Sequence, residues 1–148
     1  MFFKKFGPYL YIVLAGLFGC QRESFEPVNN ISYVGVQNVS DSRVYPTIVN
    51  AADGWDMYFG VVVPDSSAEK GGGGGFNLPR LVSLRWEEGH DRVPHVIEAL
   101  LPIANLTQAE IVGVIFVYTG KKEWFIKGMG RDNRVIFYEQ LTENRVTH

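Results

Sequence analysis

The chain is predicted to be mainly β, a β-rich α+β fold built on an antiparallel sheet or sandwich with one or two short helices. Short apolar stretches separated by Gly, Pro, Asn and Asp follow one another along residues 31–148, which is typical of short strands joined by turns. Residues 81–86 alternate between apolar and polar side chains, which is the period of a half-buried strand. Residues 112–118 are a continuous β-branched and aromatic run, and such a run favours a strand covered on both faces.

The first part of this region is expected to contain three strands and a long loop. The strands are rich in Val, Ile, Tyr and Phe: residues 31–39, 44–49 and 55–63. Pro46 indicates an edge position or a bulge for the second strand, because proline has no N–H to donate to a ladder. Pro64 ends the third strand. Residues 65–77 include five consecutive glycines at 71–75, and this segment is predicted to be a flexible loop rather than a phosphate-binding loop.

The second part contains the only helical signals. Residues 87–92 form a charged turn, and residues 94–101 fit either a helical turn or a strand. Thr107 and Glu110 have the T-x-x-E spacing of a capping box, so a brief helix is expected to begin near Thr107. Three further strands are expected: residues 112–118, 123–127 and 135–138. The polar tail from Glu139 is expected to fray.

The start of the chain has the layout of a bacterial lipoprotein signal peptide. Lys4 and Lys5 precede an apolar run over residues 6–19, and Cys20 follows directly. This run is shorter than the roughly 20 apolar residues that a permanent membrane span needs. In lipoprotein maturation the peptide is cleaved before the cysteine, whose thiol carries a diacylglyceryl group. Each buried CH₂ of the acyl chains contributes about 0.8 kcal/mol to membrane binding, so Cys20 is the expected lipidation site and membrane anchor.

This layout divides the chain into a signal peptide at 1–19, a lipidated tether at 20–30 and a single β-rich domain at 31–148. Gln21, rather than an aspartate, follows the cysteine, which favours the outer membrane with the domain facing the periplasm. Loss of Lys4 and Lys5 changes the formal net charge from −2 to about −4. A mildly acidic surface without a basic tract excludes nucleic acid as a partner. Cys20 is the single cysteine, so no disulfide stabilises the domain.

No motif in the sequence predicts an enzyme, a cofactor or a metal site. The chain lacks G-x-S-x-G, H-E-x-x-H, C-x-x-C and the phosphate-loop pattern. The best group of metal-ligand types is His90, Asp91, His95 and Glu98. Pro94 interrupts this group and its spacing matches no known pattern, so a solvated turn is expected instead.

The candidate partner-binding residues gather around tryptophan and acidic side chains. Most tryptophans in a chain of this kind pack in the core, but Trp55 directly follows a turn and is flanked by acids. Acidic residues at the strand ends either form a solvated rim or attract a basic partner electrostatically. The candidate residues are Asp53, Trp55, Asp56, Glu87, Glu88 and Asp91.

Three segments resemble a family of small bacterial lipoproteins. Residues 78–86 (LPRLVSLRW) are similar to the L-P-x-x-L-x-x-x-W core of that family, and residues 99–102 (ALLP) match its x-L-P position. Residues 113–130 resemble its closing glycine turn, tryptophan and paired glycines. Cys20 agrees with its lipobox, whereas Glu87 stands where a serine often follows the core tryptophan.

The resemblance implies a function without catalysis. Members of this and related families are often encoded beside type VI secretion effectors, especially lipases, and some act as immunity proteins. The expected function is therefore an outer-membrane-anchored periplasmic binding module that neutralises a secreted toxin such as a lipase. A structural or assembly lipoprotein of an envelope complex is the alternative, and a hydrolase that uses His90 or His95 is a third.

Overall fold

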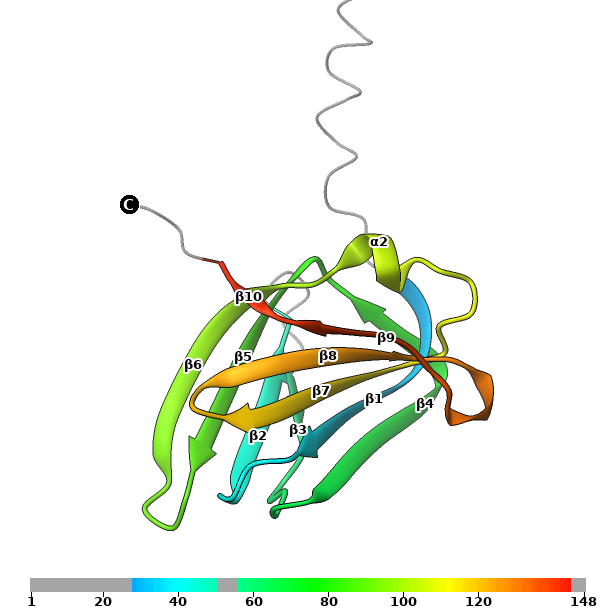
Figure 1. Ribbon diagram of the computed structural model, residues 1–148. Helices are drawn as coiled ribbons and strands as arrows, with labels where there is room; N and C mark the ends of the chain where they lie inside the picture. The colour runs from blue at the N-terminus through cyan, green and yellow to red at the C-terminus, as the bar shows by residue number, and fades with distance from the viewer. Residues whose placement is uncertain (1–27, 51–55, 145–148) are drawn as a thin grey trace, which may run out of the picture.

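The computed structural model describes residues 28–50 and 56–144, which form two five-stranded sheets (Figure 1). The first sheet has the order β4 (Ser66–Leu78), β1 (Val28–Asn38), β7 (Gly113–Gly120), β8 (Glu123–Met129) and β9 (Val135–Gln140). The second sheet has the order β10 (Thr142–Glu143), β6 (Val93–Leu100), β5 (Leu81–Glu88), β2 (Val44–Val49) and β3 (Asp56–Tyr58). The prediction of a mainly β fold is confirmed. One pair, β1 with β7, is parallel, and the other paired strands are antiparallel.

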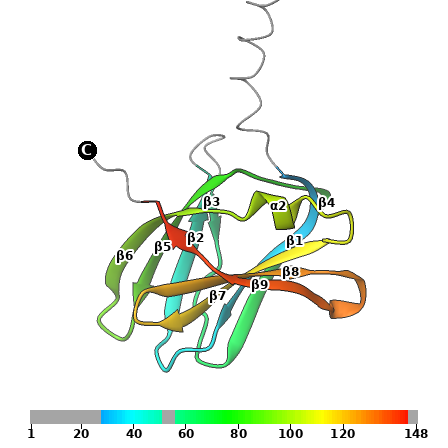
Figure 2. The ribbon, with the colours of Figure 1, turned by 45° about the horizontal axis from the view of Figure 1, so that its top comes forward.

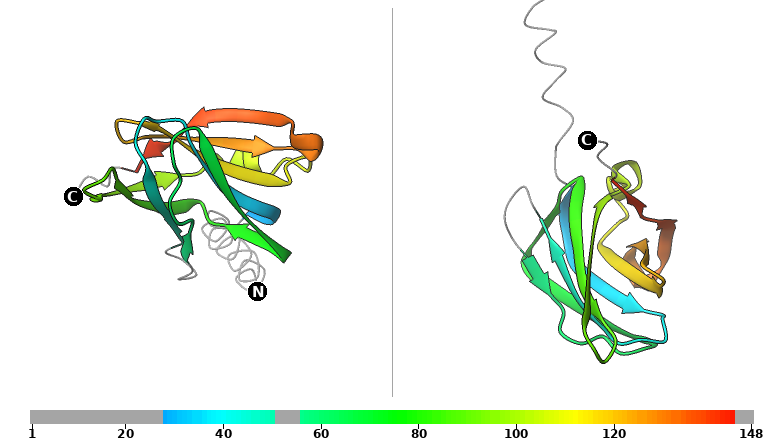
Figure 3. Two further views of the ribbon diagram at one scale, coloured as in Figure 1. Left: turned by 90° about the horizontal axis from the view of Figure 1, so that it is seen from below. Right: turned by 90° about the vertical axis from the view of Figure 1, so that its left-hand side faces the viewer.

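The turns between strands and the short helix lie at opposite ends of the two sheets. The turns from β1 to β2, from β5 to β6 and from β7 to β8 lie at one end (Figures 1 and 2). The short helix α2 (Ile103–Leu106) and the start of β1 lie at the other. Viewed from below and from the side, the two sheets curve and face each other (Figure 3).

Side chains from the inner faces of both sheets make one core. Its largest fully buried members are Trp124, Tyr118, Phe116, Ile31, Ile48, Leu78, Leu84, Leu106 and Ile126. Strand β7 is buried on both faces, as its sequence predicts. Its inward residues join the main core, and Ile115 with Val117 packs on the outside of the first sheet against Tyr33 and Phe125.

The glycine run lies in a strand, so the prediction of a loop over residues 65–77 is wrong. Strand β4 pairs with β1 from Asn38↔Ser66 to Val28↔Leu78. Between Ile31↔Phe76 and Tyr33↔Gly71, five steps along β4 stand opposite two along β1, so the glycine run holds three extra residues in an irregular bulge. The backbone ladder needs no side chains, and glycine tolerates the irregular backbone of the bulge.

The short helix also differs from its prediction. It precedes Thr107, which is its C-cap residue and donates its hydroxyl hydrogen bond back to the Ala104 carbonyl oxygen at 3.2 Å. Pro102 is the N-cap residue of α2, where its missing N–H removes no hydrogen bond from the helix, and buried Leu106 packs the helix against the core. Within the described part of the chain, no helix combines the length and apolar character that a bilayer crossing requires.

Three other boundaries differ from the sequence-based expectation. The segment 94–101, for which the sequence allowed either a helical turn or a strand, forms strand β6 as far as Leu100. The third strand is shorter than 55–63, because Gly60 has φ +69° and only an isolated bridge from Val62 to Val44 follows it. The tail from Glu139, which was expected to fray, continues β9 to Gln140 and then forms β10. Leu141 is buried between β9 and β10, and its N–H donates to the Trp124 carbonyl oxygen at 2.8 Å.

The close packing at Gly128 predicts a large effect of one added methyl group. In Gly128→Ala the new Cβ would lie 2.1 Å from Cε1 of Phe137 and 2.8 Å from Cδ1 of Ile111. Overpacking of this kind costs about 1–3 kcal/mol, and we expect the free energy of unfolding in urea to fall by that amount. Gly71→Ala is the control, because its nearest contact is a backbone oxygen of Ser32 at 3.8 Å. Equal losses in the two variants would contradict this packing.

Candidate functional site

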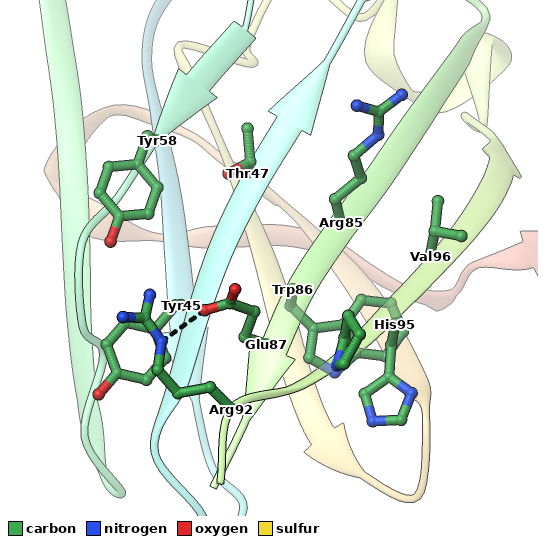
Figure 4. Close-up of a pocket in the computed structure, with 10 residues that line it drawn as sticks. Tyr45, Thr47, Tyr58, Arg85, Trp86, Glu87, Arg92, His95 and Val96 are labelled. Atoms are coloured by element: carbon green, nitrogen blue, oxygen red, sulfur yellow. Dashed lines mark hydrogen bonds and ion pairs between the residues drawn. The ribbon is translucent and has the colours of Figure 1, made fainter. Parts of the chain in front are cut away.

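The outer face of the second sheet has a hollow of about 720 Å³ (Figure 4). Strand register places one row of side chains across it, because residues paired between antiparallel strands point to the same face. Thr47 of β2 pairs with Tyr58 of β3 on one side and with Arg85 of β5 on the other. Arg85 in turn pairs with Val96 of β6. Four strands therefore contribute to a single surface.

A second row contains an interlocked group of side chains. Tyr45 of β2 pairs with Glu87 of β5, and Arg92 reaches both of them from the β5–β6 turn. The Arg92 guanidinium carbon lies 4.2 Å from the centre of the Tyr45 ring, and Nε lies 2.5 Å from Oε2 of Glu87. The hydrogen bond to Glu87 raises the pKa of Arg92 above its ordinary value. Arg92 and Glu87, the two charged groups at this row, are thus paired with each other.

Arg85 differs from Arg92 in its surroundings. It is exposed in the first row, and its guanidinium extends along the sheet away from Glu87 (Figure 4). Among residues 28–50 and 56–144, the ion pairs involve Arg92, His95 and Arg134 as the basic partners, and none involves Arg85. The face therefore has one cation without a carboxylate partner in the described structure.

Large apolar side chains remain exposed on this side of the molecule. Tyr58 is 52% exposed and Val96 is 60% exposed, although both lie in the same row as Arg85. Leu100 of β6 is also exposed, and it lies on the same face of the strand as Val96 because side chains alternate along a strand. Contiguous exposed apolar surface with a polar rim is typical of an interaction site.

An aromatic cluster supports the hollow from inside. Trp86 lies 5.2 Å from the ring of His95, and Tyr118 and Trp124 complete the cluster from the first sheet. The Tyr118 hydroxyl donates to Oε2 of Glu88 at 2.8 Å, and Nε2 of His95 lies 3.6 Å from the same oxygen. These packed rings restrain β5 and β6, the strands that hold Arg85 and Val96.

The structure does not bring the predicted acidic residues together. Glu87 is paired with Arg92, and Glu88 accepts the Tyr118 hydrogen bond on the inner side. Asp91 lies in the β5–β6 turn, whereas Asp56 begins β3 at the opposite end of the second sheet. The other candidates, Cys20, Asp53 and Trp55, lie outside the described residues, as do the predicted signal peptide and most of the tether.

The possible metal ligands are also separated. His95 and Glu98 lie on opposite faces of β6, since His95 pairs with inward Trp86 and Glu98 pairs with Ser83 on the outer face. His90 is in the turn before that strand. In the described part of the chain, no three residues of the metal-binding types His, Cys, Asp and Glu gather at one point.

Sequence reasoning missed the residues that the structure does bring together. Tyr45, Tyr58, Arg85 and Arg92 come from three strands and a turn that only the register makes neighbours. One usable signal was present. The alternation in residues 81–86 places Arg85 on the face opposite Trp86, and therefore on the outer surface.

Comparison with protein-family models, with curated proteins and with solved structures gave no match.

The hydrogen bond inside the cluster predicts a change of stability at high pH. Burial, together with the bond to Glu88, raises the pKa of Tyr118 from 10.0 to about 12. The folded protein holds this proton more tightly than the unfolded chain does, so the stabilisation is complete below pH 10 and is lost toward pH 12. We expect the free energy of unfolding to fall there by up to about 1.4 kcal/mol per pH unit.

Urea titrations at several pH values measure this slope, and Tyr118→Phe is the matched control because it keeps the ring and removes the proton. Between pH 10 and pH 12, the free energy of unfolding should fall less steeply with pH in the variant. The difference in slope between the two proteins measures the contribution of Tyr118. Identical slopes in both proteins would show that Tyr118 titrates normally.

Proposed function

We propose that this protein is a lipid-anchored binding module of the bacterial outer membrane whose domain captures a protein partner in the periplasm. The observation that supports this most strongly is the outer face of the second sheet, where exposed Tyr58, Arg85 and Val96 share one row of side chains. Tyrosine and arginine are enriched among the residues that dominate binding energy in protein interfaces. The same face exposes apolar side chains that a partner would remove from water, at about 25 cal/mol per Å².

The shape of the face favours a protein over a small ligand. A small-molecule site surrounds 70–90% or more of its ligand, by the usual range. Here about half or more of the surface of Tyr58 and of Val96 is exposed in the row that crosses the hollow. A shallow sheet surface of this kind suits a second protein, whose side chains bury surface over a wide contact area without needing a deep pocket.

The anchor is proposed from the N-terminal sequence. Lipidation of Cys20 would attach the domain through the segment before β1 and hold it close to the membrane. Anchoring raises the local concentration of the binding face near a partner in the periplasm without adding any contact to it.

The partner that we propose is a secreted toxin, such as a type VI lipase, and the module is its immunity protein. The resemblance of residues 78–86 to lipoproteins encoded beside such effectors supports this choice. Immunity needs a rigid surface that covers a toxin, and it needs no catalytic group of its own. The aromatic cluster behind the hollow supplies such rigidity.

Truncation of the exposed tyrosine tests the face directly. Where a toxic effector is encoded beside the gene, we expect its co-expression to be tolerated with the unchanged protein and to be toxic with Tyr58→Ala. Loss of a central interface tyrosine costs about 2 kcal/mol or more, which corresponds to roughly thirty-fold weaker binding. Growth in the rescue assay and the dissociation constant of the purified pair measure the two effects.

Tyr138→Ala is the matched control, because Tyr138 is 48% exposed on β9 of the other sheet. It should protect as well as the unchanged protein. No protection by any form, together with no complex in a pull-down, would refute the immunity function. Equal loss in both variants would refute the assignment of the face.

The anchor has a test of its own. In Cys20→Ala the precursor should remain uncleaved and should incorporate no labelled palmitate, because the thiol that carries the lipid is gone. The purified domain should still bind the effector with unchanged affinity, because an anchor raises the local concentration of a binding face without adding contacts to it. A mature, detergent-extracted species from this variant would overturn the lipidation site.

A further inference from the structure

We propose that Arg85 binds a carboxylate of the partner, so the segment that docks on the second sheet presents an aspartate or glutamate between apolar side chains. This inference rests on the proposed binding function and specifies the chemistry of its ligand. It also reverses the sign of the partner's charge, because the sequence alone suggested acidic residues facing a basic partner.

The charge of the hollow supports an anionic group. Its lining contains two guanidinium groups and one carboxylate, which leaves one net positive charge on a chain whose formal net charge is −2. Arg92 does not supply the free charge, since it is bonded to Glu87 and stacked on Tyr45. Arg85 is the guanidinium whose donors are unused by the described residues.

The exposed apolar side chains in the row of Arg85 make its pairing decisive. Val96 is its neighbour on β6, Thr47 is its neighbour on β2, and exposed Tyr58 lies beyond Thr47. A partner that docks against both Tyr58 and Val96 covers the row between them and removes water from the guanidinium. A charge desolvated without a partner is strongly unfavourable, whereas a carboxylate accepts two parallel N–H bonds from the planar arginine group. A partner without the acid is therefore rejected, and one with it is held in a fixed orientation.

The acidic residues of the face do not provide this carboxylate. Glu98 and Asp56 belong to the adjacent row, in which Ser83 pairs with Glu98 and Val49 pairs with Asp56. Neither forms an ion pair with Arg85 in the described structure. They flank the site on the side toward α2, where they would repel a second acidic residue of the partner and limit the docked segment to a single central acid.

Selection from a library of random peptides displayed on phage tests the proposal with the full chain in detergent. Peptides that are retained by the unchanged protein and lost on Tyr58→Ala report on the hollow. We expect these peptides to be enriched in Asp or Glu next to apolar residues and to bind Arg85→Glu at least about tenfold more weakly. Arg85→Lys should give intermediate affinity, because it keeps the charge and loses the two-pronged geometry.

Arg131→Glu is the control, since it makes the same charge change in the 3₁₀ turn Arg131–Asn133 of the first sheet. It should leave peptide affinity unchanged, and thermal unfolding should show that all variants are folded. Peptides that depend on Tyr58 but carry no acid, or that bind Arg85→Glu equally well, would refute carboxylate binding by Arg85. They would still support the outer face of the second sheet as a binding site. A selection with no peptides dependent on Tyr58 overturns both.

Discussion

Contact between Trp86 of one sheet and Tyr118 with Trp124 of the other is the interaction on which the rest of the structure depends. The ring of Trp86 lies 5.5 Å from that of Tyr118 and 5.4 Å from that of Trp124, and all three residues are buried. Aromatic pairs at such distances stabilise a fold by about 0.5–1.5 kcal/mol beyond their buried area. They join two sheets that have separate ladders, so they also set how the sheets face each other.

The same contact determines the outer surface. Side chains alternate along a strand, so a buried Trp86 forces Arg85 and Glu87 outward. The pairing of β5 with β2 then aligns Thr47 with Arg85 and Tyr45 with Glu87. A slip of one residue would bury a guanidinium and expose an indole, and the cost of either keeps the register unique. The arrangement of the outer face of the second sheet is thus a product of core packing.

Local pattern predicted those elements whose burial is uniform or strictly alternating, such as β7 and β5. It failed for β4, because residues 71–75 have no side chains to show a period and their strand conformation comes from pairing with β1. It also failed for α2, where a proline and a buried leucine outweighed the capping signal at Thr107. The hollow escaped prediction for a related reason, since its residues come from four strands and a turn that only register makes adjacent.

Strand β1 lies between two neighbours, antiparallel β4 and parallel β7. With the proposed anchor attached ahead of Val28, a pull from a bound partner would pass along this strand. Force in that direction loads both rows of hydrogen bonds in shear, so many bonds share the tension instead of opening one after another. An anchor at this point would therefore leave β1 resistant to being pulled out of its sheet.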